Sequence, residues 1–226
     1  MQHLIRFDDY TKDDVYEIFQ IADEIKDGKY QNFLEGKTVI LFFPNSSIRT
    51  RVAFEKGIHL LGGQTILFPP EALDKREKLE DVIRYLNNWA DAAVIRHKNI
   101  AIMDEIAQYA SFPVINALTD ENHPCEILSD LYALSKLRNN FCTDKFLFVG
   151  AKGNIGGAWQ EAAQVMGFEL AQCCPKGYEL DGVEVIRDLK EAVRGRDIIC
   201  TDSLTHGELH LSLIHISEPT RRVVIS

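Results

Sequence analysis

A group of hydroxyl and guanidinium side chains lies early in the chain, in the segment PNSSIRTRVAFE at residues 44–55. Ser47, Arg49, Thr50 and Arg51 supply several hydrogen-bond donors directly after an apolar run. We expect the segment to open a helix, whose free backbone N–H groups and dipole favour an anion. Arginine suits phosphate because its planar guanidinium donates two parallel hydrogen bonds. An N-cap serine followed by two solvated arginines would produce the same pattern.

A histidine and two carboxylates follow in PVINALTDENHPCEILSD, residues 113–130. His123-Pro124 is expected at a strand-to-helix transition, because proline suits the first helical turn. His123 and Glu126 are three residues apart and would share one helix face, with Asp130 on the next turn. Taken alone, this histidine fits a simple cap or surface residue as well as a functional group.

Arg96 directly follows a predicted strand at 92–95. A charged residue at the carboxyl end of a parallel strand points toward the ligand crevice, although an exposed loop arginine would have the same sequence signature. Each of the three segments lies at the carboxyl end of a different predicted strand, so a parallel sheet would bring them to one rim. Cationic donors and a histidine on one rim predict an oxyanion site with a polarised acceptor.

The elements that must position these residues alternate along the chain. Strands are expected at 37–43, 64–68, 92–95, 113–115, 145–150, 169–173, 183–186 and 197–200, and helices at 13–26, 50–61, 78–89, 100–109, 126–137, 155–166 and 189–193. This alternation predicts parallel sheets with helices on both faces. We therefore expect an α/β fold of two doubly wound parallel-sheet domains joined by a helix. The expected domains are 1–138 and 139–210, the second incomplete, with a boundary loop at 139–144.

Composition narrows the class of protein. The 226 residues are 46% hydrophobic, and 25 basic against 34 acidic residues give a formal net charge of −9. This charge argues against a nucleic-acid or anionic-membrane partner, but not against a small anionic ligand. Five cysteines without framework spacing favour a reducing compartment. The first residues do not have the pattern of a signal peptide, and apolar runs such as 39–43 are too short to span a bilayer. We therefore expect a cytoplasmic location.

The end of the chain has a different character. The segment LSLIHISEPTR at 211–221 resembles the in-frame translation of a sequencing-library adapter, with a genuine strand and tail as the alternative. We accordingly treat residues 211–226 as an artefactual tail and leave them out of the fold prediction. On this interpretation the natural protein continues beyond the trustworthy sequence.

The motifs together resemble the aspartate/ornithine carbamoyltransferase family. The matching stretches are S-x-R-T-R at 47–51, EKLED at 77–81, Arg96, and H-P-C-x-x-L-x-D at 123–130. The resemblance extends from about residue 3 to about residue 204, and the combination of the first and last motifs is its most specific part.

The resemblance implies a reaction and a set of residues. The residues implied to bind carbamoyl phosphate are Ser47, Ile48, Arg49, Thr50, Arg96, His123 and Glu126. Of these, Thr50, Arg96 and His123 would be catalytic, donating hydrogen bonds to the carbamoyl oxygen as an amine attacks the carbon. The family reaction needs no metal or organic cofactor, and positioning the two substrates does much of the work.

Glu126 departs from the family, which usually has glutamine at this position. A carboxylate can also accept a hydrogen bond from the carbamoyl NH₂, but it places negative charge beside a phosphate dianion. The carboxyl could be protonated, it could be offset by the arginines, or it could indicate a changed substrate. We expect Glu126→Gln to keep or improve carbamoyl phosphate binding.

The acceptor side resembles the ornithine branch of the family. The H-P-C form and Thr201-Asp202 support this, with Asp202 implied to bind the α-amino group of ornithine and Asn154 implied to contact the acceptor. Leu204 stands where that branch has tryptophan, and its S-M-G and H-C-L-P segments do not occur. Ornithine, giving citrulline and phosphate, is the expected acceptor; another amine or a derivatised ornithine remains open.

Two other functions remain as alternatives. Gly150, Gly153 and Gly156 follow a predicted strand and open a helix, as in a dinucleotide-binding oxidoreductase, but their spacing is G-x-x-G-x-x-G rather than G-x-G-x-x-G. A tight turn near the acceptor site explains these glycines better. The second alternative is a catalytically silent or altered-substrate paralogue, which Glu126 and the unusual acceptor motif would favour.

The resemblance also implies an assembly. Family members are trimers with active sites between subunits, so a homotrimer is expected for the full-length protein. Lys75, Arg76 and Lys78 are candidates for reaching a neighbour's site, although a solvated charge run would look the same. The chain as given would be inactive, because late acceptor-side segments of the family are absent from it.

Overall fold

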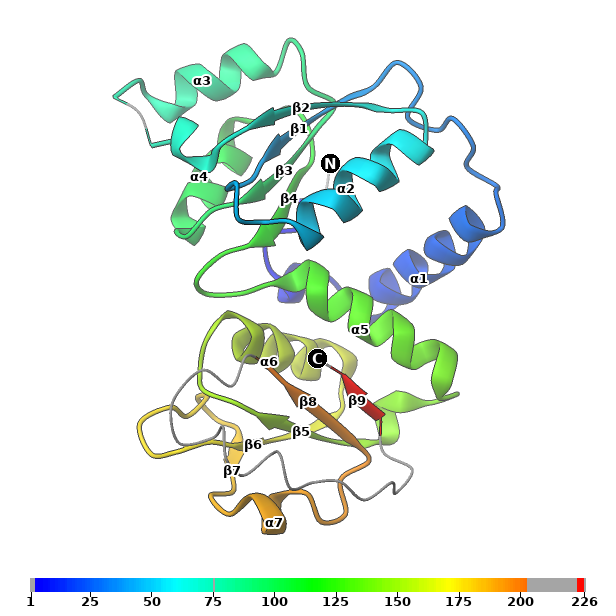
Figure 1. Cartoon of the computed structure of the whole chain (residues 1–226), viewed down its shortest axis with the longest axis vertical. Coiled ribbons are helices and arrows are strands. Elements are labelled where there is room, and N and C mark those ends of the chain that lie inside the picture. Colours follow the sequence, from blue (N-terminus) through cyan, green and yellow to red (C-terminus); the bar gives the residue numbers. More distant parts are fainter. Residues whose placement is uncertain (1–2, 75, 203–222, 226) are drawn as a thin grey trace. The chain divides into compact units, whose positions relative to one another are not determined.

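The computed structural model describes residues 3–74, 76–202 and the backbone of 223–225. The chain divides into two compact units, Met1–Glu126 and Ile127–Ser226, and each is described by itself. Helix α5 (Pro124–Leu137) spans this division (Figure 1). The boundary expected from the sequence, after residue 138, lies at the other end of the same helix.

The first unit is built on a four-stranded parallel sheet. Its strands are β1 (Thr38–Phe42), β2 (Gln64–Phe68), β3 (Ala92–Arg96) and β4 (Val114–Leu118), in the spatial order β2-β1-β3-β4. The chain runs outward from β1 to β2 and then returns to place β3 on the other side of β1. The point between β1 and β3 is therefore where the strand order reverses, the place at which open parallel sheets bind ligands.

Helices cover both faces of this sheet (Figure 1). On one face, α2 (Arg49–Leu60) packs through Ile58 against a core that includes Leu41 and Val94. On the other, α3 (Leu79–Leu86) and α4 (Ile100–Tyr109) bury Ile83 and Met103 against Ile40 and Ile95. Because successive side chains of a strand point to opposite faces, a central strand with helices on both sides must be apolar throughout.

One further helix and three short 3₁₀ helices lie outside the layers described so far. They are η1 (Phe7–Asp9), α1 (Lys12–Lys26), η2 (Pro70–Ala72) after β2, and η3 (Phe141–Thr143) in the second unit. The α1 helix begins with a capping box, in which Thr11 and Asp14 satisfy each other's backbone N–H groups. The preceding segment pairs with the sheet edge through a parallel bridge between Leu4 and Ile115.

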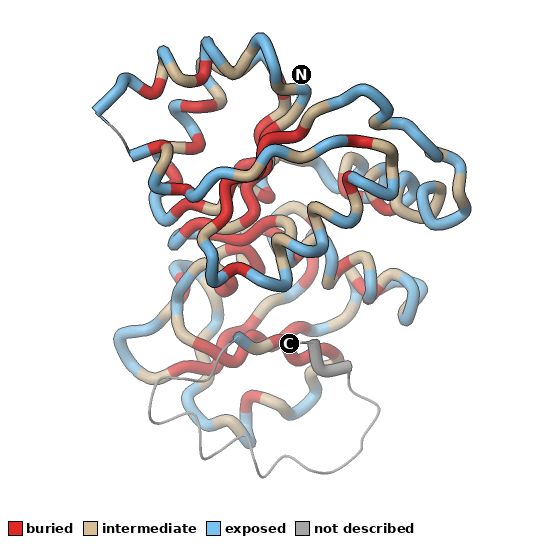
Figure 2. The backbone as a smooth tube through the Cα atoms, turned by 45° about the horizontal axis from the view of Figure 1, so that its top comes forward, coloured by how far each residue is buried: buried red, intermediate tan, exposed pale blue. Residues whose placement is uncertain are grey.

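The second unit repeats the architecture. Its strands are β5 (Lys145–Val149), β6 (Glu169–Cys173), β7 (Glu184–Val185), β8 (Ile198–Thr201) and β9 (Val223–Ile225), all parallel in the order β7-β6-β5-β8-β9. One face packs on α7 (Leu189–Ala192) and the other on α6 (Asn154–Met166), where Trp159 contacts Phe146. Figure 2 shows buried backbone concentrated along the strands of both sheets.

The predicted fold class of two parallel-sheet α/β units is confirmed. Most element ends lie within two residues of the expected position, and two were wrong by three residues. The helix expected to run to Trp89 ends at Leu86, beside Asn87, whose side chain donates to Tyr109 O (2.9 Å) and accepts from Ser111 N (2.7 Å). The strand expected at 113–115 continues to Leu118, so that β4 reaches as far as the end of β3.

Among the described residues, no helix combines the length and the apolar character that crossing a bilayer requires.

Candidate active site

Two predicted donors meet where the strand order of the first sheet reverses. Ser47 is buried, with 5% of its surface exposed, in the loop between β1 and α2. Arg96, the last residue of β3 rather than the first residue after it, donates from Nη1 to Ser47 Oγ (3.1 Å). The N-cap of α2 is Ile48, which makes no side-chain cap hydrogen bond. Ser47 is therefore a partner of Arg96 and not a helix cap.

The first turn of α2 contains the other predicted cradle residues. Arg49, Thr50 and Arg51 follow the N-cap, and this turn contains no acidic residue. Its backbone N–H groups lack intrahelical acceptors, so the turn is a suitable environment for an anion. Arg51 is held along the helix by Glu55 (Nε to Oε2, 3.0 Å), whereas Ile48 is largely exposed.

His123 and Glu126 form a pair at the start of α5. The His123 ring is buried, and its Nε2 lies 3.0 Å from Glu126 Oε2. Its Nδ1 is buried without a hydrogen-bond partner among the described residues. The Glu126 side chain is 45% exposed, so the carboxylate occupies the open side of the pair. A solvated surface histidine, the alternative considered from the sequence, does not describe this residue.

The electrostatics of Glu126 connect it to the other donors. The hydrogen bond from His123 is the main cause that lowers the pKa of this carboxyl, against the opposing effect of burial. The positive charges of Arg49 and Arg96 lower the pKa further. The Glu126 carboxyl is therefore close enough to the start of α2 and to the end of β3 for the charges of these arginines to act on it.

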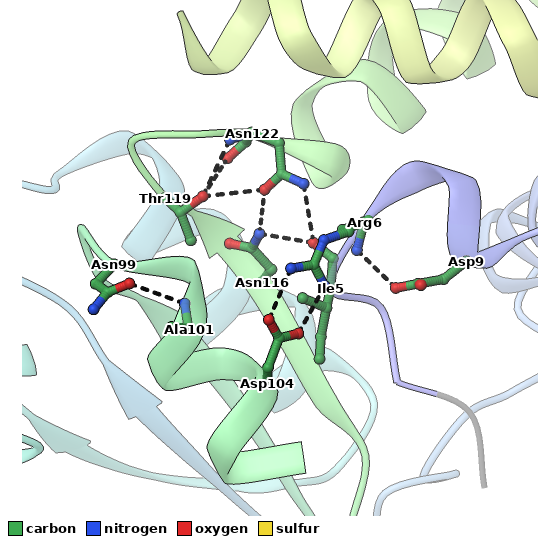
Figure 3. A network of polar contacts seen from close by, with 9 residues as sticks. All are labelled: Ile5, Arg6, Asp9, Asn99, Ala101, Asp104, Asn116, Thr119 and Asn122. Carbon is green, nitrogen blue, oxygen red and sulfur yellow. Dashed lines mark hydrogen bonds and ion pairs between the residues drawn. The ribbon is translucent and has the colours of Figure 1, made fainter. Parts of the chain in front are cut away.

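A buried polar network, which the sequence analysis missed, holds the loop that leads to His123 (Figure 3). Asn116, Thr119 and Asn122 are almost completely buried. Asn116 Nδ2 donates to Ile5 O (2.9 Å) and to Asn122 Oδ1 (2.7 Å), and Thr119 Oγ1 also donates to Asn122 Oδ1 (3.1 Å). Buried polar groups need such partners, so the network fixes the backbone immediately before His123.

Further contacts extend this network. Cys125 Sγ donates to Asn116 O (3.2 Å), so the chain is anchored on both sides of His123. Arg6 donates to both carboxylate oxygens of Asp104 in α4 (2.7 and 2.8 Å), which fastens the N-terminal segment supplying Ile5 O (Figure 3). In the sequence, the network could be suspected only from the two asparagines, Asn116 in a strand and Asn122 after it. Their partner Ile5 is distant in the chain.

His97 is a second residue that the sequence analysis missed. Its Nδ1 lies 3.1 Å from Asn99 N, and its Nε2 lies 3.1 Å from Asp74 Oδ1. This pair ties the loop after η2 to the carboxyl end of β3. Of the loop residues predicted to reach a neighbouring subunit, Arg76 and Lys78 are exposed, and Lys75 lies outside the described residues.

The predicted acceptor residues belong to the second unit. Its strand order reverses between β5 and β8. Asn154 is the first residue of α6, which follows β5, and Asp202 is exposed directly after β8. Thr201 Oγ1 donates to Val149 O (2.9 Å), which joins the ends of these neighbouring strands. Leu204 and residues 211–222 and 226 of the proposed artefactual tail lie outside the described residues.

The glycines after β5 make room for an aromatic ring. A Cβ atom on Gly150 would lie 2.8 Å from Phe148 Cζ, and one on Gly156 would lie 2.9 Å from Phe148 Cε1. Gly153 has open space around the same position. Packing against the buried Phe148 ring thus accounts for two of the three glycines, and it supports the interpretation of this segment as a tight turn.

Comparison with known proteins agrees with the motifs. The family described as "Aspartate/ornithine carbamoyltransferase, carbamoyl-P binding domain" matches residues 2–136. An ornithine carbamoyltransferase of Geobacter metallireducens is 36% identical over 220 residues, covering 89% of this chain and 73% of the relative. The chloroplastic ornithine carbamoyltransferase of Pisum sativum is 37% identical, covering 89% of this chain and 59% of the relative.

Solved structures give the same result. The ornithine carbamoyltransferase from Pyrococcus furiosus matches with a TM-score of 0.83 and 29% identity, covering 91% of this chain and 72% of that one. The ornithine carbamoyltransferase from Gloeobacter violaceus matches with a TM-score of 0.84 and 29% identity, covering 99% of this chain and 84% of that one.

Proposed function

The chain belongs to the aspartate/ornithine carbamoyltransferase family, and from this premise we propose that the protein transfers the carbamoyl group of carbamoyl phosphate to ornithine, giving citrulline and phosphate. The observation that carries the proposal is the group of residues at or after the ends of β1, β3 and β4: Arg96 donates a hydrogen bond to Ser47, and His123 pairs with Glu126, whose pKa the charge of Arg49 also lowers. Similarity to ornithine carbamoyltransferases over most of the chain supports the acceptor.

The phosphate half of the substrate fits the start of α2. Ser47, Arg49 and Thr50, with the free N–H groups of the first turn around Ile48, would hold the phosphoryl oxygens. The guanidinium of Arg49 supplies charge and the helix dipole adds to it. This part of the site determines where the carbonyl carbon lies.

The carbamoyl oxygen would lie toward Arg96, His123 and Thr50. As the ornithine amine attacks the carbon, negative charge develops on this oxygen, and fixed donors stabilise it. The C–O bond to phosphate then breaks, phosphate leaves with the bonding electrons, and the proton lost by the amine passes to the leaving phosphate. Each such donor is worth about 3–4 kcal/mol of transition-state stabilisation. Holding both reactants in place contributes further, because it removes the entropy cost of their encounter.

On the acceptor side, Asp202 would bind the α-amino group of ornithine and Asn154 would contact the same substrate. A carboxylate is a suitable partner for an ammonium group because their hydrogen bond is charge-assisted. Asn154 and Asp202 follow β5 and β8, the strands on either side of the second reversal of strand order. Their positions thus follow the same rule as the donors of the first unit.

We further propose a cytoplasmic homotrimer in which Arg76 and Lys78 reach a neighbouring subunit. Both residues are exposed on the loop that His97 and Asp74 fasten to β3. Light scattering of the full-length protein would give the mass of the assembly. A monomer at the concentrations of the activity assay would contradict this part of the proposal.

The function is tested in two steps. The gene is first resequenced beyond codon 202, so that the protein assayed is the natural chain whatever its length. Calorimetric titration with carbamoyl phosphate then tests the first unit, and citrulline formation from ornithine tests the whole reaction. Absence of carbamoyl phosphate binding would contradict the proposal. Binding without citrulline formation would favour the silent or altered-substrate paralogue, for which Glu126 is the specific observation.

A further inference from the structure

We propose that Glu126 is an internal counter-ion of the anion site, and that it takes up a proton when carbamoyl phosphate binds. This inference rests on the proposed function, because carbamoyl phosphate is the anion it requires. It goes further by predicting that binding and protonation are coupled in this chain, and by assigning the coupling to one residue. The predicted consequence is a substrate affinity that depends on pH through Glu126.

The carboxylate lies among the groups that would attract a phosphate. His123 Nε2 is 3.0 Å from Glu126 Oε2, and the charges of Arg49 and Arg96 act on the same carboxyl. His123 immediately precedes α5, Arg49 is the first residue of α2 and Arg96 is the last residue of β3, so the positive groups that act on Glu126 come from three parts of the first unit. The protein therefore already neutralises part of the positive charge of its own anion site.

A glutamine at this position would behave differently. Glutamine has almost the same shape, but it is neutral and does not titrate. A phosphate dianion that enters beside glutamine meets only donors, whereas beside Glu126 it meets a like charge. Two neighbouring anions cannot both remain ionised without cost, so one of them gains a proton or moves away. Because the Glu126 side chain is 45% exposed, a proton can reach it from solvent.

The direction of the coupling follows from the contacts. In the protein alone, the hydrogen bond from His123 and the two arginine charges hold the pKa of Glu126 below its usual range. A dianion bound among these groups neutralises their charge and repels the carboxylate, so the pKa of Glu126 rises in the complex. A group with a higher pKa in the complex takes up a proton on binding, and this coupling is reciprocal.

The pH dependence can then be stated with its sign. Affinity is greatest at low pH, where Glu126 is protonated before the anion arrives. It weakens as the pH rises through the window between the pKa of Glu126 in the free protein and its higher pKa in the complex, and it is constant above that window. The variant that tests this dependence must keep His123, so that Glu126 is the only group changed.

The test is calorimetric titration of the whole chain with carbamoyl phosphate, comparing the native protein with Glu126→Gln. Each titration is run from about pH 5 to about pH 8, which brackets histidine titration, in pairs of buffers with different ionisation enthalpies. The buffer dependence of the heat counts the protons taken up. The native protein should take up more protons than Glu126→Gln. At the upper pH the variant should bind about tenfold more tightly for each unit by which the anion raises the pKa of Glu126.

Controls separate this effect from a general loss of negative charge. Glu55→Gln removes the same charge from the same unit, but Glu55 is paired with Arg51, so the proton count should stay at the native value. The ionisation of carbamoyl phosphate itself is common to all variants and cancels. Glu126→Ala provides a second variant if the amide destabilises the fold, and it should also lower the proton count.

The possible outcomes distinguish the inference from the function on which it rests. If native protein and both Glu126 variants bind carbamoyl phosphate with equal proton uptake, the inference is wrong and the proposed function stands. If none of them binds carbamoyl phosphate at any pH, the proposed function is wrong as well. A larger proton uptake by the native protein alone supports the inference.

Discussion

Arg96 has a structural contact and a proposed catalytic role, and melting temperature and activity report on them separately. It donates to Ser47 across the reversal of strand order, and it is proposed to stabilise the carbamoyl oxygen. We expect Arg96→Gln to reduce kcat/KM for citrulline formation by about 10²–10³-fold, the usual effect of losing one oxyanion donor. Its melting temperature should change little, because a partly exposed arginine contributes little to stability.

The control for this prediction is Arg84→Gln. Arg84 is an arginine of the same unit, but it pairs with Glu80 on the surface of α3 (2.9 Å). Its kinetics should match those of the native protein. A similar loss of activity in both variants would show that the total positive charge of the unit matters, rather than the position of Arg96.

Asn122 acts through its neighbour His123, and we expect it to be a positioning residue. In Asn122→Ala, Asn116 and Thr119 each lose a buried hydrogen bond to Asn122 Oδ1. Leaving a buried polar group unpaired costs about 1–3 kcal/mol, which denaturant unfolding can measure. The loss of position should lower kcat more than it changes KM, and should alter the pH profile of kcat.

Asn88→Ala serves as the comparison for Asn122→Ala. The exposed Asn88 side chain donates to Arg84 O (3.2 Å) and to Tyr85 O (3.1 Å), in the same unit but in no contact with the network. It should alter neither kcat nor the pH profile. If Asn122→Ala lost stability but kept the native pH profile and kcat, the network would be structural and would not position His123.

At the scale of the elements, the positions of glycine and proline and the spacing of apolar residues predicted most of the fold. Glycine and proline pairs separated the apolar runs, and the alternation of strands and helices was sufficient for two parallel sheets. The rim of donors followed, because parallel strands end at one edge. The contacts at the end of α3 could not be predicted in this way, since the Asn87 side chain bonds backbone groups more than twenty residues away.

The buried network was missed for a related reason. Asn116 lies in β4, where polar residues are uncommon, and its partner is a carbonyl at position 5. Local sequence patterns contain no information about a partner so distant in the chain. The pairing of His123 with Glu126 was visible, by contrast, because residues three apart on a helix are neighbours. The position of His123 next to Glu126 was therefore predictable, but the buried network that holds the loop before His123 was not.

The turn from β5 to α6 leads to a prediction about one element. Gly150→Ala places a Cβ against the buried ring of Phe148, and overpacking of this kind costs about 1–3 kcal/mol. Gly153→Ala, with extended backbone and open space, should be tolerated. Combining Gly150→Ala with Phe148→Leu should recover part of the loss, because the smaller side chain leaves room. Denaturant unfolding of the native protein and these three variants would measure these effects.

A different result would change the interpretation of these glycines. If Gly150→Ala were as stable as the native protein, packing against Phe148 would not explain this glycine. The close approach of a ligand to the backbone would then be the better explanation. Equal losses in Gly150→Ala and Gly153→Ala would indicate that the turn needs flexible backbone at both positions.

At the scale of the whole molecule, one thiol in each unit reports on that unit separately. Burial raises the pKa of the Cys125 thiol, in the first unit, to about 12, and raises that of Cys200, in the second, well above its usual value. Because the thiolate is the reactive form, both residues should be labelled by a thiol reagent only after their own unit unfolds. Labelling against denaturant, read by mass spectrometry of the two peptides, gives one unfolding curve for each unit.

The variant Gly150→Ala turns these curves into a test of the two-unit organisation. Phe148 belongs to the core of the second unit, so the overpacking should move the Cys200 curve to lower denaturant. The Cys125 curve should stay in place, because the first unit has its own buried clusters on both faces of its sheet. An equal shift of both curves would mean that the units unfold as one, since destabilising one core would then expose the thiol of the other.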